Sequence, residues 1–338
     1  MRRERKTLKV LTLPLFWAVL IGVVGWSALA IYYSNLPPIV GKVCSILFAL
    51  AAVVVIMRVR PWRRAAAMLL AGFGIVLAGW MAIPPSNDRM WRPDVAVLPY
   101  ATMDGDLVTV HNIRNFDYRS ETDFTSSYYD KTFDLRQLDA VDLFAVYWMG
   151  PHIAHTFLSF GFGGKDYLAV SIETRKEQGE GYSTIKGFFR QYELFYVVAD
   201  ERDVVRVRTN YRKPAEDVYL YRIRGSAKNG RSLFLEYMQR INGLKERPEF
   251  YNTVTANCTT AIWLNAQVVH NPLPFSWKLL LSGHTPEYLY EQGLLDQSLP
   301  FAELQKRSWI NARARAADGA DDFSARIRAD ADAAWDLD

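Results

Sequence analysis

The chain has 338 residues, of which 50% are hydrophobic and 22% are charged. Forty Lys and Arg residues against 36 Asp and Glu residues give a formal net charge of +4. The globular part contains no basic helix or stripe, so a nucleic-acid partner is not expected. Two cysteines exclude a disulfide scaffold and a Cys-rich zinc site, and we expect neither a metal nor another cofactor.

Three apolar runs lie within the first 85 residues, at positions 13–31, 43–57 and 65–83. A helix needs about 20 apolar residues to cross a bilayer, and the second run reaches that length only with residues 39–42. A cleaved signal peptide would explain one run but not three. Buried helices of a soluble core are the less favoured alternative. The sequence therefore predicts a three-helix transmembrane anchor over residues 1–85.

The basic residues beside these runs predict their orientation. Four Lys and Arg residues lie within positions 2–6 and four arginines within 58–64, whereas the loop 34–41 has none. Loops rich in Lys and Arg usually stay on the cytoplasmic side. We therefore expect a multi-pass protein of the bacterial inner membrane, with a cytoplasmic N-terminus and everything after residue 86 in the periplasm.

The remainder reads as an α+β domain with an antiparallel sheet. Alternating apolar and β-branched residues predict a hairpin over residues 155–174, with Gly163-Gly164 in its turn. Further strands are expected at 107–110, 133–135, 143–148, 195–199, 204–207 and 218–223, and helices at 227–246 and about 257–269. A periplasmic domain over 86–305 would then precede a charged, Ala-rich C-terminal tail over 306–338.

Cys258 is the only cysteine outside the predicted spans, because Cys44 lies in the second apolar run. In an oxidising compartment an unpaired thiol is prone to oxidation unless it is buried, so an unpaired cysteine there suggests a chemical role. Cys258 follows Asn257 at the start of a predicted helix, where backbone N–H groups and the positive helix end lower a thiol's pKa. These features indicate a nucleophile. A buried, inert structural cysteine is the alternative.

A thiol nucleophile needs a base, which is normally a histidine. His155 opens the predicted hairpin and is the best candidate, with His152 beside it as a possible auxiliary group. A turn at Gly164 and Lys165 brings the region of Glu173 opposite His155. We therefore expect Glu173 to orient the imidazole, with Ser171 as the second choice. Alternatively, Glu173 could simply pair with the neighbouring Arg175.

A cluster of charged residues occupies positions 200–212. Such a cluster could hold a metal ion or a phosphate. Alternating signs instead favour a network of ion pairs.

The order of these residues resembles a known fold family. A histidine on a strand, followed about 100 residues later by an Asn-Cys pair at a helix start, is similar to the circularly permuted NlpC-type papain-like fold. More specifically, a string of motifs over roughly residues 90–300 resembles the Lnb periplasmic-domain family, which is named for a bacterial lipoprotein N-acyltransferase. The motifs begin at positions 155, 171, 200, 210, 250 and 257 and read HTFLSFGF, SIETR, DERD, NYR, FYNT and NCTT.

This resemblance implies a Cys–His acyltransferase at the outer face of the inner membrane, with Cys258 as nucleophile and His155 as base. Its expected acyl donor is a membrane phospholipid, and its acceptor is a lipoprotein amine or another amine or hydroxyl. Candidates for substrate or oxyanion contacts are Asn257, Thr259, Ser171, His152, Tyr251 and Asn252. One departure is that the spans precede this domain, whereas they follow it in the named enzyme. The alternatives are a thiol amidase or peptidase acting on peptidoglycan, and an inert structural or sensor module.

Overall fold

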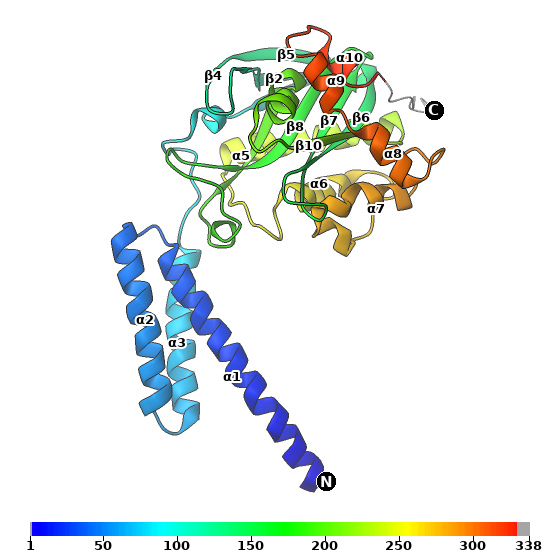
Figure 1. The fold of residues 1–338 in the computed structure, drawn as a ribbon. Coiled ribbons are helices and arrows are strands. Elements are labelled where there is room, and N and C mark those ends of the chain that lie inside the picture. The colour runs from blue at the N-terminus through cyan, green and yellow to red at the C-terminus, as the bar shows by residue number, and fades with distance from the viewer. Residues whose placement is uncertain (1, 330–338) are drawn as a thin grey trace. The chain divides into compact units, whose positions relative to one another are not determined.

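The structure is a computed structural model that describes residues 2–329 of the chain (Figure 1). The chain forms two compact units. The first contains Met1–Ser86 together with Ser183–Tyr192, and the second contains Asn87–Tyr182 together with Glu193–Asp338. The first unit thus contains Ser183–Tyr192 in addition to the segment 1–85 that we expected to form the anchor.

The first unit is built on three helices, α1 (Arg2–Tyr32), α2 (Pro38–Arg58) and α3 (Trp62–Met81). All three are long and apolar enough to cross a membrane, over Pro14–Tyr32, Pro38–Arg58 and Trp62–Met81. Small and aliphatic side chains pack between them in a cluster of Leu20, Ala52, Ala66 and Leu69. The prediction of three helices capable of spanning a membrane is therefore confirmed in number and position.

The segment Ser183–Tyr192 completes this unit at the ends of α1 and α3. The Phe189 ring stacks on Tyr33 with centroids 5.4 Å apart. The Arg190 guanidinium lies 4.3 Å from the centroid of Trp80 and donates a hydrogen bond of 2.9 Å to the Met81 carbonyl oxygen. Arg190 thus places a cation against the C-terminal carbonyls of α3, where the helix end is electronegative.

The second unit is organised by an eight-stranded sheet with the order β1-β2-β9-β8-β7-β6-β10, in which β5 also pairs with β2. All pairs are antiparallel except a short parallel contact between β2 and β9. The strands are β1 (Tyr100–Asp104), β2 (Leu107–Arg114), β5 (Tyr128–Asp134), β6 (Leu138–Tyr147), β7 (Ala154–Phe162), β8 (Asp166–Arg175), β9 (Glu193–Asp200) and β10 (Asp217–Arg222). A separate ribbon joins β3 (Asp117–Tyr118) to β4 (Phe124–Thr125). The predicted α+β class with an antiparallel sheet is confirmed.

Helices cover the two faces of this sheet (Figure 1). On one face, Phe160 of β7 packs against Phe234 with ring centroids 5.1 Å apart. On the other, Phe157 shares a buried cluster with Ile310 and Phe323. The helices are α4 (Glu201–Arg206), α5 (Ala227–Glu246), α6 (Cys258–Asn265), α7 (Thr285–Glu291), α8 (Phe301–Ser308), α9 (Asn311–Ala316) and α10 (Phe323–Arg326). The two predicted helices correspond to α5 and to α6 with its 3-10 extension Ala266–Val268.

One predicted strand is wrong. Residues 204–207 lie in α4 and in a π-helical turn, Val207–Tyr211, that follows it. The Asp200 side chain caps α4 by accepting a hydrogen bond of 2.9 Å from the Arg202 N–H. Val204 and Val205 are buried. This short apolar run faces the core from a helix, a case that composition alone does not distinguish from a strand.

The part of the expected C-terminal tail that the structure describes, residues 306–329, packs against the second unit, and residues 330–338 lie outside the described residues. Ile310, Phe323 and Ile327 are fully buried, whereas the residues between them include exposed positions such as 318, 319, 321 and 322. Arg328 donates a hydrogen bond of 2.7 Å to the buried carboxylate of Glu201 and one of 2.8 Å to Asp142. The charged, Ala-rich composition of this segment predicted a solvated tail, because its few buried apolar residues and the buried Arg328 do not stand out in the average.

Candidate active site

Cys258 is the first residue of α6, and Asn257 forms the cap of that helix. The Asn257 side-chain oxygen accepts hydrogen bonds of 2.9 Å from the N–H groups of Thr259 and Thr260. The Thr260 hydroxyl in turn accepts from the Asn257 N–H, which completes a capping box. The Asn257 amide group donates to the Thr253 carbonyl oxygen at 2.8 Å. Asn257 therefore positions the thiol through the backbone, because its side-chain oxygen caps the helix and its amide group holds the Thr253 carbonyl oxygen.

The backbone N–H of Cys258 is the better oxyanion candidate. It occupies the first helical position, where N–H groups lack a partner within the helix. Among residues 2–329, no acceptor lies within hydrogen-bonding distance and geometry of this N–H. A donor beside the reacting sulfur at the positive end of a helix can stabilise a developing oxyanion.

The segment before α6 is held by Asn252. Its side-chain oxygen accepts hydrogen bonds of 3.0 Å from the N–H groups of Val254 and Thr255, so it closes a turn. Tyr251 is buried, and both burial and the charge of Cys258 raise the pKa of its hydroxyl. Tyr251 is thus a protonated group near the thiol. Asn252, which we expected to contact substrate, has its side-chain oxygen committed to the turn.

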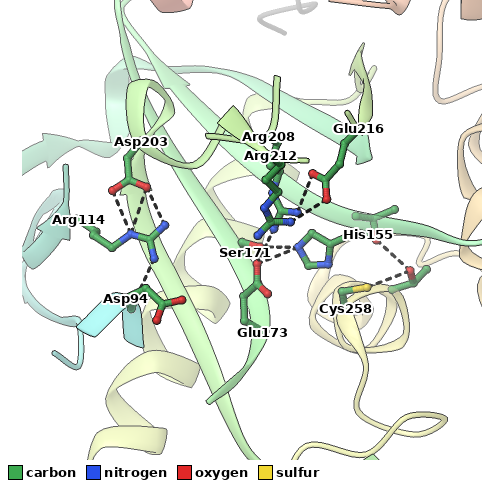
Figure 2. Close-up of polar contacts among 12 residues, drawn as sticks. Asp94, Arg114, His155, Ser171, Glu173, Asp203, Arg208, Arg212, Glu216 and Cys258 are labelled. Atoms are coloured by element: carbon green, nitrogen blue, oxygen red, sulfur yellow. Dashed lines mark hydrogen bonds and ion pairs between the residues drawn. The ribbon is translucent and has the colours of Figure 1, made fainter. Parts of the chain in front are cut away.

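His155 lies on β7 and is 8% exposed. Its Nε2 is 2.7 Å from the Ser171 hydroxyl oxygen and 3.2 Å from Oε1 of Glu173. Figure 2 shows the ring between Glu173 and Cys258, so that the other ring nitrogen, Nδ1, faces the thiol side. The hairpin thus places both predicted orienting residues on one nitrogen of His155, and Ser171 also donates to Glu173 at 2.9 Å.

These neighbours shift the pKa values of the thiol and the imidazole in opposite directions. Burial alone would raise the pKa of Cys258, but the charge of His155 and a hydrogen bond with it lower that pKa to about 7. Burial alone would lower the pKa of His155, but the Glu173 carboxylate raises it to about 9. Between these two values the site holds a thiolate beside an imidazolium, which is the reactive form of a thiol nucleophile.

Arg208 is a residue of this site whose role the sequence did not reveal. It is 4% exposed and donates a hydrogen bond of 2.8 Å to Oε1 of Glu173 (Figure 2). Burial alone would raise the pKa of Glu173, but His155 and then Arg208 hold it well below its ordinary value. Arg208 lies in the π-helical turn Val207–Tyr211 after α4. We had predicted a strand over residues 204–207, immediately before Arg208. No spacing in the sequence relates it to β8.

The rest of the 200–212 cluster forms ion pairs, as the alternating signs indicated. Arg114 binds the buried Asp203 at 2.7 Å, and Arg212 binds Glu216 at 2.8 Å (Figure 2). Among residues 2–329, no group of three or more His, Cys, Asp or Glu side chains is arranged to hold a metal ion.

Two threonines connect the helix start to the sheet. The Thr259 hydroxyl lies 2.9 Å from the Thr156 hydroxyl of β7 and 3.8 Å from the Cys258 sulfur. Both threonines are buried. Thr259 therefore contacts the Cys258 thiol and fixes α6 against the strand that carries His155. Thr156 was not among the predicted site residues.

His152 is not part of this constellation. Its Nδ1 lies 2.8 Å from Nε2 of His284, and the two rings stack at the protein surface. His284 also contacts Glu287 at 3.3 Å. His111 is likewise engaged elsewhere, stacked on Tyr100. Of the predicted site residues, the structure brings together Cys258, His155, Glu173, Ser171, Thr259 and Tyr251.

The chain was compared with known protein families, curated proteins and solved structures. No curated protein and no solved structure matches the chain, so the resemblance to the permuted papain-like fold stays a prediction. Residues 124–283 match the family model of the Lnb N-terminal periplasmic domain. This stretch contains Cys258, His155 and Glu173. The match and the three apolar helices together support a membrane-anchored, Lnb-like protein with a periplasmic domain.

Proposed function

We propose that this protein is a membrane-anchored thiol acyltransferase. It would move an acyl chain from a phospholipid, through a thioester on Cys258, to an amine acceptor, most specifically the N-terminus of a lipoprotein. The observation that carries this proposal is the Cys258 thiol at the start of α6, whose pKa His155 lowers to about 7. The match to the Lnb domain and the three spans support a lipid substrate.

In the first half-reaction the Cys258 thiolate attacks the carbonyl carbon of a phospholipid ester. The N–H of Cys258 stabilises the oxyanion of the tetrahedral intermediate. When the ester C–O bond breaks, the His155 imidazolium gives its proton to the leaving oxygen, and a lysophospholipid departs. A thioester on Cys258 and a neutral His155 remain.

In the second half-reaction an amine attacks the thioester carbonyl. The neutral His155 takes the proton that the amine loses as the C–N bond forms. The C–S bond then breaks, and Cys258 leaves as a thiolate beside the regenerated imidazolium. Glu173 keeps Nε2 of His155 oriented and stabilises its positive charge in both half-reactions.

The test is to reconstitute the full chain in vesicles that contain isotope-labelled phospholipid and to analyse the Cys258 peptide by mass spectrometry. The expected result is an acyl adduct on Cys258 that disappears when a lipopeptide amine is added, with equimolar N-acylated lipopeptide formed. Cys258→Ala should give no transfer, whereas Cys44→Ser should behave as the unchanged protein, because Cys44 lies in α2.

The outcome also separates the alternatives. If no adduct forms and the protein releases stem peptides from peptidoglycan in a Cys258-dependent way, it is a thiol amidase or peptidase. If neither reaction occurs and Cys258→Ala leaves the cellular phenotype unchanged, the acyltransferase proposal fails in favour of an inert module.

A further inference from the structure

An apolar surface follows Cys258 in the chain. Phe275 and Trp277 are each 56% exposed, and Leu264 of α6 is 51% exposed. Large apolar side chains rarely gather on the surface of a soluble domain without a binding role. The surface consists of Leu264, Val268, Phe275, Trp277, Leu280 and Leu281.

Internal contacts hold this surface together as one piece. The Trp263 indole N–H donates a hydrogen bond of 2.9 Å to the Leu273 carbonyl oxygen. The Trp263 ring meets Phe275 edge to face, with centroids 5.6 Å apart. The backbone N–H of Leu281 donates to the Trp277 carbonyl at 3.2 Å. These loops are therefore folded elements that present apolar side chains outward.

The same stretch is almost free of charge. Between Glu249 and Glu287 the only charged residue is Lys278, in a chain of which 22% is charged. Lys278 is itself paired, at 2.7 Å with Glu291 and at 3.1 Å with Glu287. Transfer of this surface into an apolar phase would therefore desolvate few charged groups.

We propose that this apolar surface docks into the lipid bilayer that the spans cross. The chain passes from α3 into the second unit over only a few residues, 82–86, and returns to the span unit at Ser183–Tyr192. A bilayer is thus always within reach of the domain. Trp and Phe side chains with little nearby charge suit the boundary between headgroups and acyl chains.

Docking would bring lipid to the thiol. Cys258 begins α6, and Leu264 on the same helix belongs to the apolar surface. An acyl chain in contact with this surface would present its ester end at the headgroup level, where the α6 N-terminus could reach it. The docking itself does not depend on whether Cys258 carries an acyl group.

The test uses the full chain with Cys258→Ala, reconstituted in vesicles of phosphatidylethanolamine and phosphatidylglycerol. The vesicles also contain a phospholipid with a diazirine in its acyl chain. After illumination, mass spectrometry maps the labelled residues. We expect labels on α1–α3 and on residues 264–281. The hairpin turn between β1 and β2 should stay unlabelled, although Met103 and Leu107 are each 42% exposed.

A pair of matched variants sharpens this test. Phe275→Ser with Trp277→Ser should reduce labelling of residues 264–281 to the level of the β1–β2 turn and leave labelling of the spans unchanged. Met103→Ser with Leu107→Ser should change neither the labelling of residues 264–281 nor the labelling of the spans. If the spans are labelled and residues 264–281 of the parent protein are not, the docking proposal is wrong, whatever the outcome of the acyl-transfer assay.

Discussion

Arg208 donates a hydrogen bond of 2.8 Å to Oε1 of Glu173, the same oxygen that lies 3.2 Å from Nε2 of His155. A single carboxylate oxygen therefore faces a permanent cation on one side and the proposed base on the other. Arg208 also lies 3.6 Å from Glu216, which Arg212 binds in turn. The carboxylate that orients the imidazole is thus held by a network of ion pairs that continues from Arg208 to Glu216 and Arg212.

Arg208→Met should destabilise the protein strongly. The substitution leaves the carboxylates of Glu173 and Glu216 partly buried with one cation fewer, and loss of one partner of a buried pair typically costs about 3–5 kcal/mol. The free energy of unfolding, measured in detergent micelles by denaturant titration, should fall accordingly. Adding Glu216→Gln should restore part of the loss. Lys306→Met removes an exposed ion pair with Glu303 and should change nothing measurable.

The reactivity of Cys258 should titrate near pH 7. In a Cys44→Ser background, the rate of alkylation by iodoacetamide should rise with a midpoint near this value, because His155 lowers the pKa of the thiol. His155→Gln removes that effect and leaves burial, which raises the pKa. At pH 7 the thiolate fraction should then fall by roughly 50-fold or more. An unchanged midpoint in His155→Gln would show that the two side chains do not interact.

Glu173→Gln should move the same profile in the same direction. The Glu173 carboxylate raises the pKa of His155 to about 9, so its removal makes the imidazolium lose its proton at a lower pH. The thiol loses its cationic neighbour, and the alkylation midpoint of Cys258 rises. Ser171→Ala keeps the carboxylate and should shift the midpoint less. A larger shift in Ser171→Ala than in Glu173→Gln would assign the orienting role to Ser171.

Asn257 can be tested as a cap rather than as an oxyanion donor. Asn257→Ala removes the cap and should cost about 1 kcal/mol of unfolding free energy, with a loss of Cys258 reactivity as the helix start loosens. Asn257→Ser can cap the helix with its hydroxyl but has no amide group. Recovery of both stability and acyl transfer in Asn257→Ser supports the capping role. Recovery of stability without activity would support a direct chemical role.

The contact between Thr156 and Thr259 should be visible in a double-mutant cycle. Each single change to Val leaves a buried hydroxyl without its partner, which typically costs about 1–3 kcal/mol. The double variant should lose less unfolding free energy than the sum of the two single changes. Strict additivity would mean that this hydrogen bond does not contribute to stability.

The parts of this site that could be predicted from sequence are those set by local geometry. The turn at Gly163-Gly164 fixes the hairpin register, in which Phe162 pairs with Asp166 and Leu158 with Val170. Continued along the strands, the same register brings His155 opposite Glu173. Asn257 and Thr260 likewise signal a helix start immediately before Cys258. Both inferences depend on residues close together in the chain.

The parts that could not be predicted depend on contacts between distant segments. Arg208 reaches Glu173 from a π-helical turn that had no recognisable sequence pattern. Arg328 pairs with Asp142 and Glu201 on one face of the sheet, from a segment whose composition suggested a solvated tail. The positions of charged residues in a sequence do not indicate which residues they pair with. Such pairs can therefore be identified only in the folded structure.

The placement of Ser183–Tyr192 with the spans has a practical consequence for handling this protein. A fragment that begins at Asn87 would still carry Phe189 and Arg190, but it would lack Tyr33, Trp80 and the α3 carbonyls that they contact. Phe189, now 4% exposed, would face water and favour aggregation. A fragment without the three helices is therefore expected to aggregate. The protein should be purified with the helices retained.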